Sequence, residues 1–229
     1  MATYNGESYI EEQLNSILEQ LGEFDEVVIC DDCSSDNTIN VINSIGDTRV
    51  KVFSNEENLG YIRNFIKSIT LAKGEVIFLA DQDDIWIKGR LALMLKELEV
   101  SGKMVVVGNY DCFNQLDGEI FKPNINLSSK SNGSYLKNIL TIFKGGIPYF
   151  GCCMAFTKGF KEILLNKCSY EISHDIMIAL IGNRFGCIHH IERPVLLRRI
   201  HGLNVTNSNR PLRDKLMTRL KWLSFILRV

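Results

Sequence analysis

Residues 77–91 read IFLADQDDIWIKGRL, and the change of character within this stretch decides how the rest of the chain is interpreted. An apolar run, typical of a buried strand, ends abruptly at Asp81, Gln82, Asp83 and Asp84. Carboxylates grouped at the end of a strand repel one another and are costly to remove from water. A divalent cation among them offsets that cost, and Mn²⁺ and Mg²⁺ prefer oxygen ligands. The stretch therefore predicts a bound Mn²⁺ or Mg²⁺.

The composition of the chain limits the class of protein. Its 229 residues are 45% hydrophobic and 23% charged, which suits a soluble globular protein with one sizeable domain. A formal net charge of −1 argues against general nucleic-acid binding. Met1 leads into a polar stretch rather than a signal peptide, and no apolar run approaches the roughly 20 residues that cross a bilayer. Seven cysteines in such a chain favour reduced thiols, and we expect a cytoplasmic protein.

Apolar runs of strand length alternate along the first half with stretches whose apolar residues recur at helical spacing. The runs begin near residues 27, 50, 76 and 104. Strands that are apolar throughout and separated by amphipathic helices predict an α/β fold with a mostly parallel sheet covered on both faces. The stretch ATYNGE at residues 2–7 reads as the loop after a first strand. We therefore expect that first strand to be missing or truncated.

Polar residues follow each of three predicted strands. Asp31 and Asp32 follow the first full strand, the stretch 55–60 follows the next, and residues 81–84 follow the third. Right-handed crossovers place all these strand ends along one edge, where such folds bind ligands. Ser34 or Ser35 could cap the following helix, but capping does not explain paired aspartates after two different strands.

Seven segments in series carry a resemblance to a known family. They are ATYNGESYIEEQLNSIL, VVICDDCSSDNT, NEENLGYIRNF, AKGEVIFLADQDDIW, GCCMAF, HD and RIHGLNV, between residue 1 and about residue 205. In this order they resemble the family 2 glycosyltransferases of the GT-A fold, most closely the bacterial rhamnosyltransferase-like members. The resemblance implies an inverting, metal-dependent transfer from a nucleoside-diphosphate sugar, either dTDP-rhamnose or a UDP-sugar. The implied acceptor is a hydroxyl of a saccharide, free or lipid-linked, in cell-surface polysaccharide synthesis.

The resemblance also implies which residues hold the metal and the diphosphate. Asp83 matches the metal ligand of the family's DxD motif, and Asp81 is expected to face the ribose or the metal. Asp84 is expected to position the sugar. In the segment RRIHGLN, His201 matches a third metal ligand and Arg199 a diphosphate contact.

The nucleoside side of the donor is implied in the same way. Thr3, Tyr4 and Glu7 match residues that line the base and the ribose, where a Tyr ring offers a stacking face. Asp32 matches the acceptor for a pyrimidine N3–H, which uridine and deoxythymidine share. Arg63 matches a basic residue near the donor, although an ordinary solvated helix position describes it equally well.

The acceptor side is centred on Asp175 in the segment ISHDIMIAL. The resemblance makes Asp175 the base that removes the proton of the acceptor hydroxyl. A structural alternative is that this aspartate is favoured by the dipole in the first turn of a helix. Arg198 stands where the family usually has an aromatic residue, and Ile176 and Met177 replace aromatics common after the base. These departures bear on specificity more than on the class of reaction.

The chain divides into three parts on this interpretation: a donor-binding half at 1–108, an acceptor-binding half at 109–205 and a tail at 206–229. The tail combines basic residues with leucines at helical spacing. It could lie on an anionic membrane surface, or pack against the domain or against a second subunit of a homodimer. Its basic residues are Arg210, Arg213, Lys215, Arg219, Lys221 and Arg228.

Two other functions are compatible with parts of the pattern. A non-catalytic nucleotide-sugar binder would result if the truncated strand or the altered acceptor residues abolish turnover. A receiver-like signalling domain would explain Asp31 and Asp32 after a strand, but it leaves residues 81–84 and Asp175 unexplained.

Overall fold

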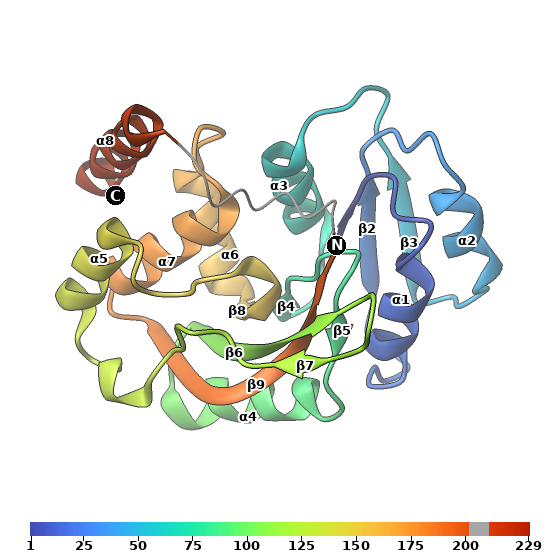
Figure 1. Ribbon diagram of the computed structural model, residues 1–229, viewed down its shortest axis with the longest axis horizontal. Helices are drawn as coiled ribbons and strands as arrows, with labels where there is room; N and C mark the ends of the chain where they lie inside the picture. Colours follow the sequence, from blue (N-terminus) through green and yellow to red (C-terminus); the bar gives the residue numbers. More distant parts are fainter. Residues whose placement is uncertain (202–210) are drawn as a thin grey trace.

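The computed structural model describes residues 1–201 and 211–229, with only the backbone of Leu212. The predicted boundary at 205/206 and the tail residue Arg210 lie outside these ranges. Helices lie on both sides of two sheets (Figure 1). In chain order the elements are β1 (Ala2–Thr3), α1 (Ile10–Leu18), β2 (Val27–Asp31), α2 (Thr38–Ser44), β3 (Val50–Ser54), α3 (Tyr61–Leu71), β4 (Val76–Phe78), β5 (Ile85–Trp86), α4 (Arg90–Ser101), β6 (Val105–Asn114), β7 (Ile120–Phe121), α5 (Tyr135–Lys144), β8 (Met154–Thr157), α6 (Lys158–Lys167), α7 (His174–Arg184), β9 (Ile188–Ile200) and α8 (Leu212–Arg228).

The first sheet is parallel, as predicted, and has the order β1-β2-β3. Strand β2 is buried along its whole length, in agreement with its unbroken apolar run. Strand β1 pairs only with the end of β2, where Ala2 faces Cys30 and Thr3 faces Asp31. The first strand is thus present but only two residues long, and Ala2 and Thr3, which the sequence assigned to the following loop, form it. A cavity of about 800 Å³ lies beside Met1, between residues of β2 and β4.

The second sheet is mixed, which the sequence did not predict. Its order is β4-β8-β6-β9-β5, with β7 paired to β6. Strand β8 runs antiparallel to both β4 and β6, so those two strands are parallel to each other but not adjacent. The expected parallel direction is thus retained, and an apolar strand from the second half fills the space between them. Residues 108 and 109 are neighbours inside β6, which pairs in parallel with β9.

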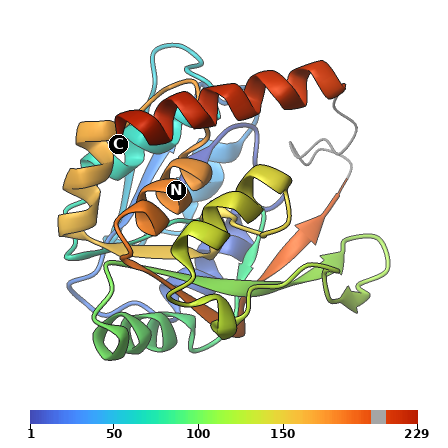
Figure 2. The same ribbon diagram turned by 90° about the vertical axis from the view of Figure 1, so that its left-hand side faces the viewer.

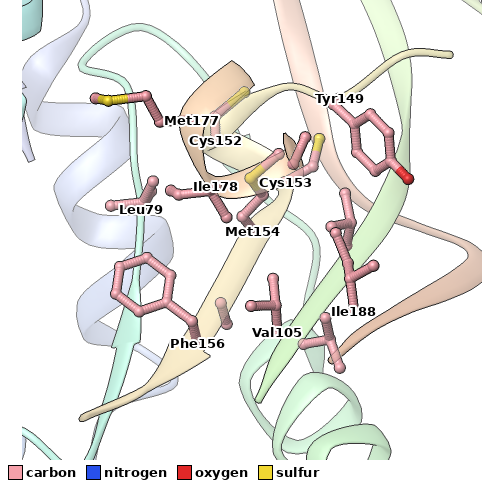
Figure 3. Close-up of a cluster of buried hydrophobic side chains, with 14 of the residues drawn as sticks. Leu79, Val105, Tyr149, Cys152, Cys153, Met154, Phe156, Met177, Ile178 and Ile188 are labelled. Atoms are coloured by element: carbon pink, nitrogen blue, oxygen red, sulfur yellow. The ribbon is translucent and has the colours of Figure 1, made fainter. Parts of the chain in front are cut away.

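The core of the second sheet fixes the position of the acidic turn. Leu79 follows β4, Met154 begins β8 and Val105 begins β6, and Ile178 of α7 packs with them in one buried cluster (Figure 3). Each of these four side chains is at most 2% exposed. Burial of a side chain of this size stabilises the fold by roughly 1.5–3 kcal/mol. Because Leu79 is held in this way, the chain enters residues 81–84 from a fixed direction.

A buried histidine ties β9 to the segment before α5. His190 is 1% exposed, and its Nδ1 lies 2.7 Å from the Ser131 hydroxyl oxygen. Its Nε2 lies 2.6 Å from the Tyr149 hydroxyl oxygen. Burial lowers the pKa of His190 to about 4 from the ordinary 6.5. The folded protein therefore holds this ring neutral at pH values where the unfolded chain protonates it.

This histidine predicts a loss of stability in mild acid. Between the unfolded pKa and the folded pKa the unfolded state binds more protons, so the free energy of unfolding falls as the pH falls. From neutral pH to about pH 5 the loss amounts to roughly 2 kcal/mol. Urea denaturation of the wild type and of His190→Gln at both pH values checks this. The variant should show a smaller pH dependence, and equal dependence in the two proteins would contradict the assignment.

Helix α8 lies against α5 and α7, far from β1–β3 (Figures 1 and 2). Trp222 and Phe225 are buried there, and the Trp222 ring meets Phe143 edge-on at 5.9 Å. The sequence left packing against the domain open for this tail, and one face of the helix does pack in that way. Among the helices described here, none has both the length and the apolar character needed to span a bilayer.

Candidate active site

The acidic turn at residues 81–84 is fastened to the N-terminal loop and to α1. The side-chain amide of Gln82 accepts from the Tyr4 backbone N–H at 2.9 Å and donates to the Tyr4 carbonyl oxygen at 3.0 Å. The Nε2 group of Gln13 donates to the Asp81 carbonyl oxygen at 2.8 Å. A side chain at Gly6 would place its Cβ 2.5 Å from Gln82 Oε1, so only glycine leaves room for this amide. These contacts set the direction of the acidic side chains.

Two of the predicted acids, Asp81 and Asp84, lie together with Cys152. One carboxylate oxygen from each acid and the Cys152 sulfur are all within 4.8 Å of one another. Burial, followed by the charge of Asp83, raises the pKa of Asp81 to about 6. Burial, followed by the charges of Asp81 and Asp83, raises the pKa of Asp84 to about 8. Within the described parts of the chain, Asp84 Oδ2 is buried without a hydrogen-bond partner.

The third acid, Asp83, meets His201. Asp83 Oδ2 lies 2.9 Å from His201 Nε2, across 118 residues of sequence. The imidazole ring of His201 also stacks on Tyr9, with the ring centroids 4.6 Å apart. The sequence predicted that these two residues share a metal, and the fold brings them together.

Arg199 lies beneath the acidic turn rather than at an open surface. It is buried, and its Nε donates to the Asp83 carbonyl oxygen at 2.9 Å while its guanidinium pairs with Glu12. Its backbone N–H donates to Asp84 Oδ1 at 3.2 Å. Arg199 therefore holds β9 and α1 to the turn. The sequence predicted only a diphosphate contact for Arg199 and not this structural role.

The residues at 81–84 and His201 suit a divalent cation. They offer oxygen and imidazole ligands, and the raised pKa values mark carboxyl groups that burial and mutual repulsion destabilise as anions. Asp84 Oδ2 has no hydrogen-bond partner among the described residues, so a cation could take this oxygen as a ligand. Such a set fits Mn²⁺ or Mg²⁺.

Two arginines supply positive charge beside the acids. Arg90 is 1% exposed, and its Nη2 donates to the Cys152 carbonyl oxygen at 2.6 Å. Burial lowers the pKa of Arg90 to about 10. The guanidinium carbon of Arg198 lies 4.6 Å from the centre of the Phe150 ring, and its charge opposes the rise of the pKa of Asp84. Neither Arg90 nor Cys152 was predicted as a neighbour of the acids, because only the folding of residue 152 beside the turn creates these contacts.

The predicted nucleoside-side residues surround the ends of β1 and β2. Thr3 is buried and donates to Asp31 Oδ1 at 2.9 Å, while the side chain of Tyr4 is 50% exposed and available for stacking. Glu7 accepts from the Asn37 backbone N–H at 2.7 Å. Glu7 thus ties the N-terminal loop to α2.

Asp32 is buried and already has several hydrogen bonds. It accepts from the Asn55 side-chain amide at 2.7 Å and from the backbone N–H groups of Leu59 and Gly60 at 2.8 and 2.9 Å. Asp32 therefore shapes the 55–60 loop. Arg63 on α3 is exposed, and its guanidinium carbon lies 4.6 Å from the centre of the Tyr170 ring, in the loop before α7.

Asp175 is the second residue of α7. Its charge contributes to the rise of the pKa of Asp81, after burial and Asp83. Its neighbour His174 is buried and stacks on Phe65 at 3.9 Å. A Cβ at Gly151 would come within 2.4 Å of His174 Nε2, so the GCC turn can approach the start of α7 only through glycine. Asp175, the predicted base, is thus near enough to Asp81 for the two charges to interact.

Comparison with curated proteins gives relatives that act on sugars. The UDP-Glc:alpha-D-GlcNAc-diphosphoundecaprenol beta-1,3-glucosyltransferase WfgD of Escherichia coli is 32% identical over 114 residues, covering 50% of this chain and 45% of that protein. The dTDP-rhamnosyl transferase RfbG of Shigella flexneri is 39% identical over 98 residues, covering 40% and 34%. The matches therefore span less than half of the length of either relative.

Solved structures share the fold. TarS 1–349 of S. aureus in complex with UDP-GlcNAc superposes with a TM-score of 0.72 at 17% identity, covering 99% of this chain and 64% of that one. Glucosyl-3-phosphoglycerate synthase from Mycobacterium tuberculosis, solved with Mn²⁺, UDP and glucosyl-3-phosphoglycerate, gives 0.60 at 18% identity, covering 99% and 77%. These likenesses confirm the predicted GT-A fold.

The family model for glycosyl transferase family 2 matches residues 1–164. This range includes β1–β8 and the whole acidic turn. A match over that much of the sequence, joined to the shared fold, shows that the chain belongs to glycosyl transferase family 2, as its motifs predicted.

Proposed function

We propose that the protein is an inverting, metal-dependent glycosyltransferase that uses a nucleoside-diphosphate sugar. The observation that supports this proposal is the grouping of Asp81 with Asp84, next to the pair formed by Asp83 and His201. Burial and mutual repulsion penalise the charged forms of Asp81 and Asp84. Asp83 and His201 would hold Mn²⁺ or Mg²⁺, with Asp81 beside them. When bound, the cation neutralises the charge that develops on the departing diphosphate.

Asp175 acts as the base in this proposal. As the acceptor oxygen bonds to the anomeric carbon, the bond from that carbon to the diphosphate oxygen breaks. The acceptor proton passes to the Asp175 carboxylate, and the nucleoside diphosphate leaves from the opposite face. Attack from the opposite face inverts the anomeric centre. In this proposal Asp84 would position the donor sugar, and Tyr4, whose side chain is 50% exposed, would stack on the base.

The donor and acceptor follow from the chemistry of the relatives. Their printed names include a UDP-glucose transferase that acts on a diphosphoundecaprenol acceptor and a dTDP-rhamnosyl transferase. We infer a dTDP-rhamnose or UDP-sugar donor and a saccharide acceptor, free or lipid-linked, at the cytoplasmic side of a membrane. Residues 1–108 would bind the donor and 109–205 the acceptor, with the 206–229 tail as an attachment.

The test is a panel of nucleoside-diphosphate sugars with and without Mn²⁺, read by thermal shift and by release of nucleoside diphosphate. A correct donor at about 100 times its Kd should raise the melting temperature by roughly 5 °C in the presence of Mn²⁺. Release of nucleoside diphosphate should then depend on a saccharide acceptor. Failure of every uridine and deoxythymidine donor to shift melting would contradict the proposal.

A non-catalytic nucleotide-sugar binder is the second candidate. The observation that favours it is Arg198, a cation in the position where the family's sugar pocket has an aromatic residue. Donor-dependent thermal shift without transfer to any saccharide would select this function. Membership of the glycosyltransferase family leaves the receiver-like alternative without support.

A further inference from the structure

The inner face of helix α8 packs against the domain. Trp222 and Phe225 are 9% and 2% exposed and belong to the main core cluster. Arg219 lies on this side, with its Nε donating to the Phe143 carbonyl oxygen at 2.6 Å and its guanidinium over the Trp222 ring at 4.2 Å. These contacts fix the rotation of the helix about its axis, and therefore also fix which side chains point outward.

The outward face carries a row of leucines, which we call the leucine stripe. Its members are Leu216, Leu220, Leu223 and Leu227, and they are 60, 50, 46 and 77% exposed. Their spacing of four, three and four residues places them on one side of the helix. Four leucines in a continuous exposed row leave apolar surface in water that a monomer rarely shows unless it binds something there.

Basic residues flank the leucine stripe on both sides. At 3.6 residues per turn, Arg213, Lys221 and Arg228 fall along one side of the stripe and Lys215 along the other, while the Arg219 guanidinium turns inward to Phe143 and Trp222. Lys221 Nζ lies 4.0 Å from a Glu171 carboxylate oxygen, and Asp214 is the acid that α8 itself contributes. A leucine row between two cationic borders is the arrangement of helices that lie in the plane of a bilayer surface.

The basic residues beside the leucine stripe favour an anionic lipid surface over a second copy of the chain as its binding partner. If two copies paired through their leucine stripes, the basic borders would face one another at the positions that set partner choice in paired helices. Like charges opposed in this way cost affinity, whereas an anionic headgroup layer attracts each cation. The leucines would then enter the acyl boundary while Trp222 and Phe225 stay in the protein core.

We infer that the leucine stripe of α8 docks the protein onto an anionic lipid surface. The inference rests on the proposed function in one respect: binding to a lipid surface would bring the candidate site to a lipid-linked acceptor. Docking on this side leaves the face of α8 that contacts α5 and α7 undisturbed, so the domain can fold identically with and without lipid (Figure 2).

Vesicle flotation of the full chain, without donor or acceptor, tests this inference. The wild type should float with phosphatidylcholine vesicles carrying about 30% phosphatidylglycerol, and roughly tenfold less with neutral vesicles. The variant Leu216→Ser/Leu220→Ser/Leu223→Ser should lose flotation at least ~10-fold, since each side chain loses its apolar contact with lipid. Replacing Arg213 and Lys215 with glutamine should lower binding to the anionic vesicles by roughly tenfold.

The control is Leu116→Ser, which changes a still more exposed leucine (95%) on the β6–β7 turn and should float as the wild type does. Melting temperatures show whether each variant folds. The inference would be overturned if the serine variant floated as well as the wild type, or if the wild type did not float with anionic vesicles. A dimer in sedimentation velocity that the serine variant dissociates, with no flotation, would assign the stripe to a second copy instead. Because no sugar is present, each result is separate from the test of transfer.

Discussion

The variant Asp175→Asn is expected to transfer sugar on the order of 10³-fold more slowly than the wild type while binding the donor nearly as well. The amide keeps the size of the side chain and its place at the start of α7, but it cannot accept the proton of the acceptor hydroxyl. A positioned general base contributes about 10²–10⁴-fold to a rate. Initial rates of nucleoside diphosphate release at saturating donor and acceptor measure the effect, and calorimetry measures donor affinity.

A control aspartate separates this effect from a general change of charge. Asp214→Asn alters an exposed acid on α8 and should leave both rate and affinity within about twofold of the wild type. Wild-type transfer by Asp175→Asn would mean that Asp175 only favours the first turn of its helix, which is the structural alternative that the sequence left open.

Asp83→Ala is expected to abolish the contribution of Mn²⁺ to donor binding. This carboxylate meets His201 at 2.9 Å, and its removal leaves the imidazole without its acidic partner at the metal position. Loss of a metal that stabilises the diphosphate by several kcal/mol corresponds to roughly 10³-fold in transfer rate. Unlike Asp175→Asn, this variant should lose donor affinity together with rate.

The matched control for this variant is Asp214→Ala. It removes a carboxylate outside the site and should bind the donor with Mn²⁺ as the wild type does. If Asp83→Ala retained the full gain from Mn²⁺, the pairing of Asp83 with His201 would be a structural contact alone.

The sequence predicted the strands and helices of the first half because each is defined locally, but it did not predict their division between two sheets. The run at 27–30 is apolar without interruption and becomes the buried strand β2. The antiparallel pairing of β8 with β4 and β6 could not be predicted from local sequence, because the residues of β8 do not indicate which strands they will pair with. That choice is made by the packing of β4 and β6, which lie far away in the sequence.

The candidate site likewise has residues that the sequence predicted and contacts that it did not. Its acids were visible as a cluster in the sequence, and the family motif linked His201 to them across 118 residues. The contacts of Gln82 with Tyr4 and of Arg90 with Cys152 were not visible, because they use backbone atoms. The hydrogen bonds of Asp32 with the 55–60 loop likewise depend on where that loop folds back.

Titration calorimetry of a nucleoside diphosphate into the wild-type protein, with and without Mn²⁺, shows whether a divalent cation joins the carboxyl groups at residues 81–84 to the diphosphate. Burial and mutual repulsion raise the pKa values of Asp81 and Asp84, and a divalent cation would offset both, so Mn²⁺ should tighten binding of uridine or deoxythymidine diphosphate at least ~10-fold. Equal affinity with and without Mn²⁺ for both nucleotides would contradict the account.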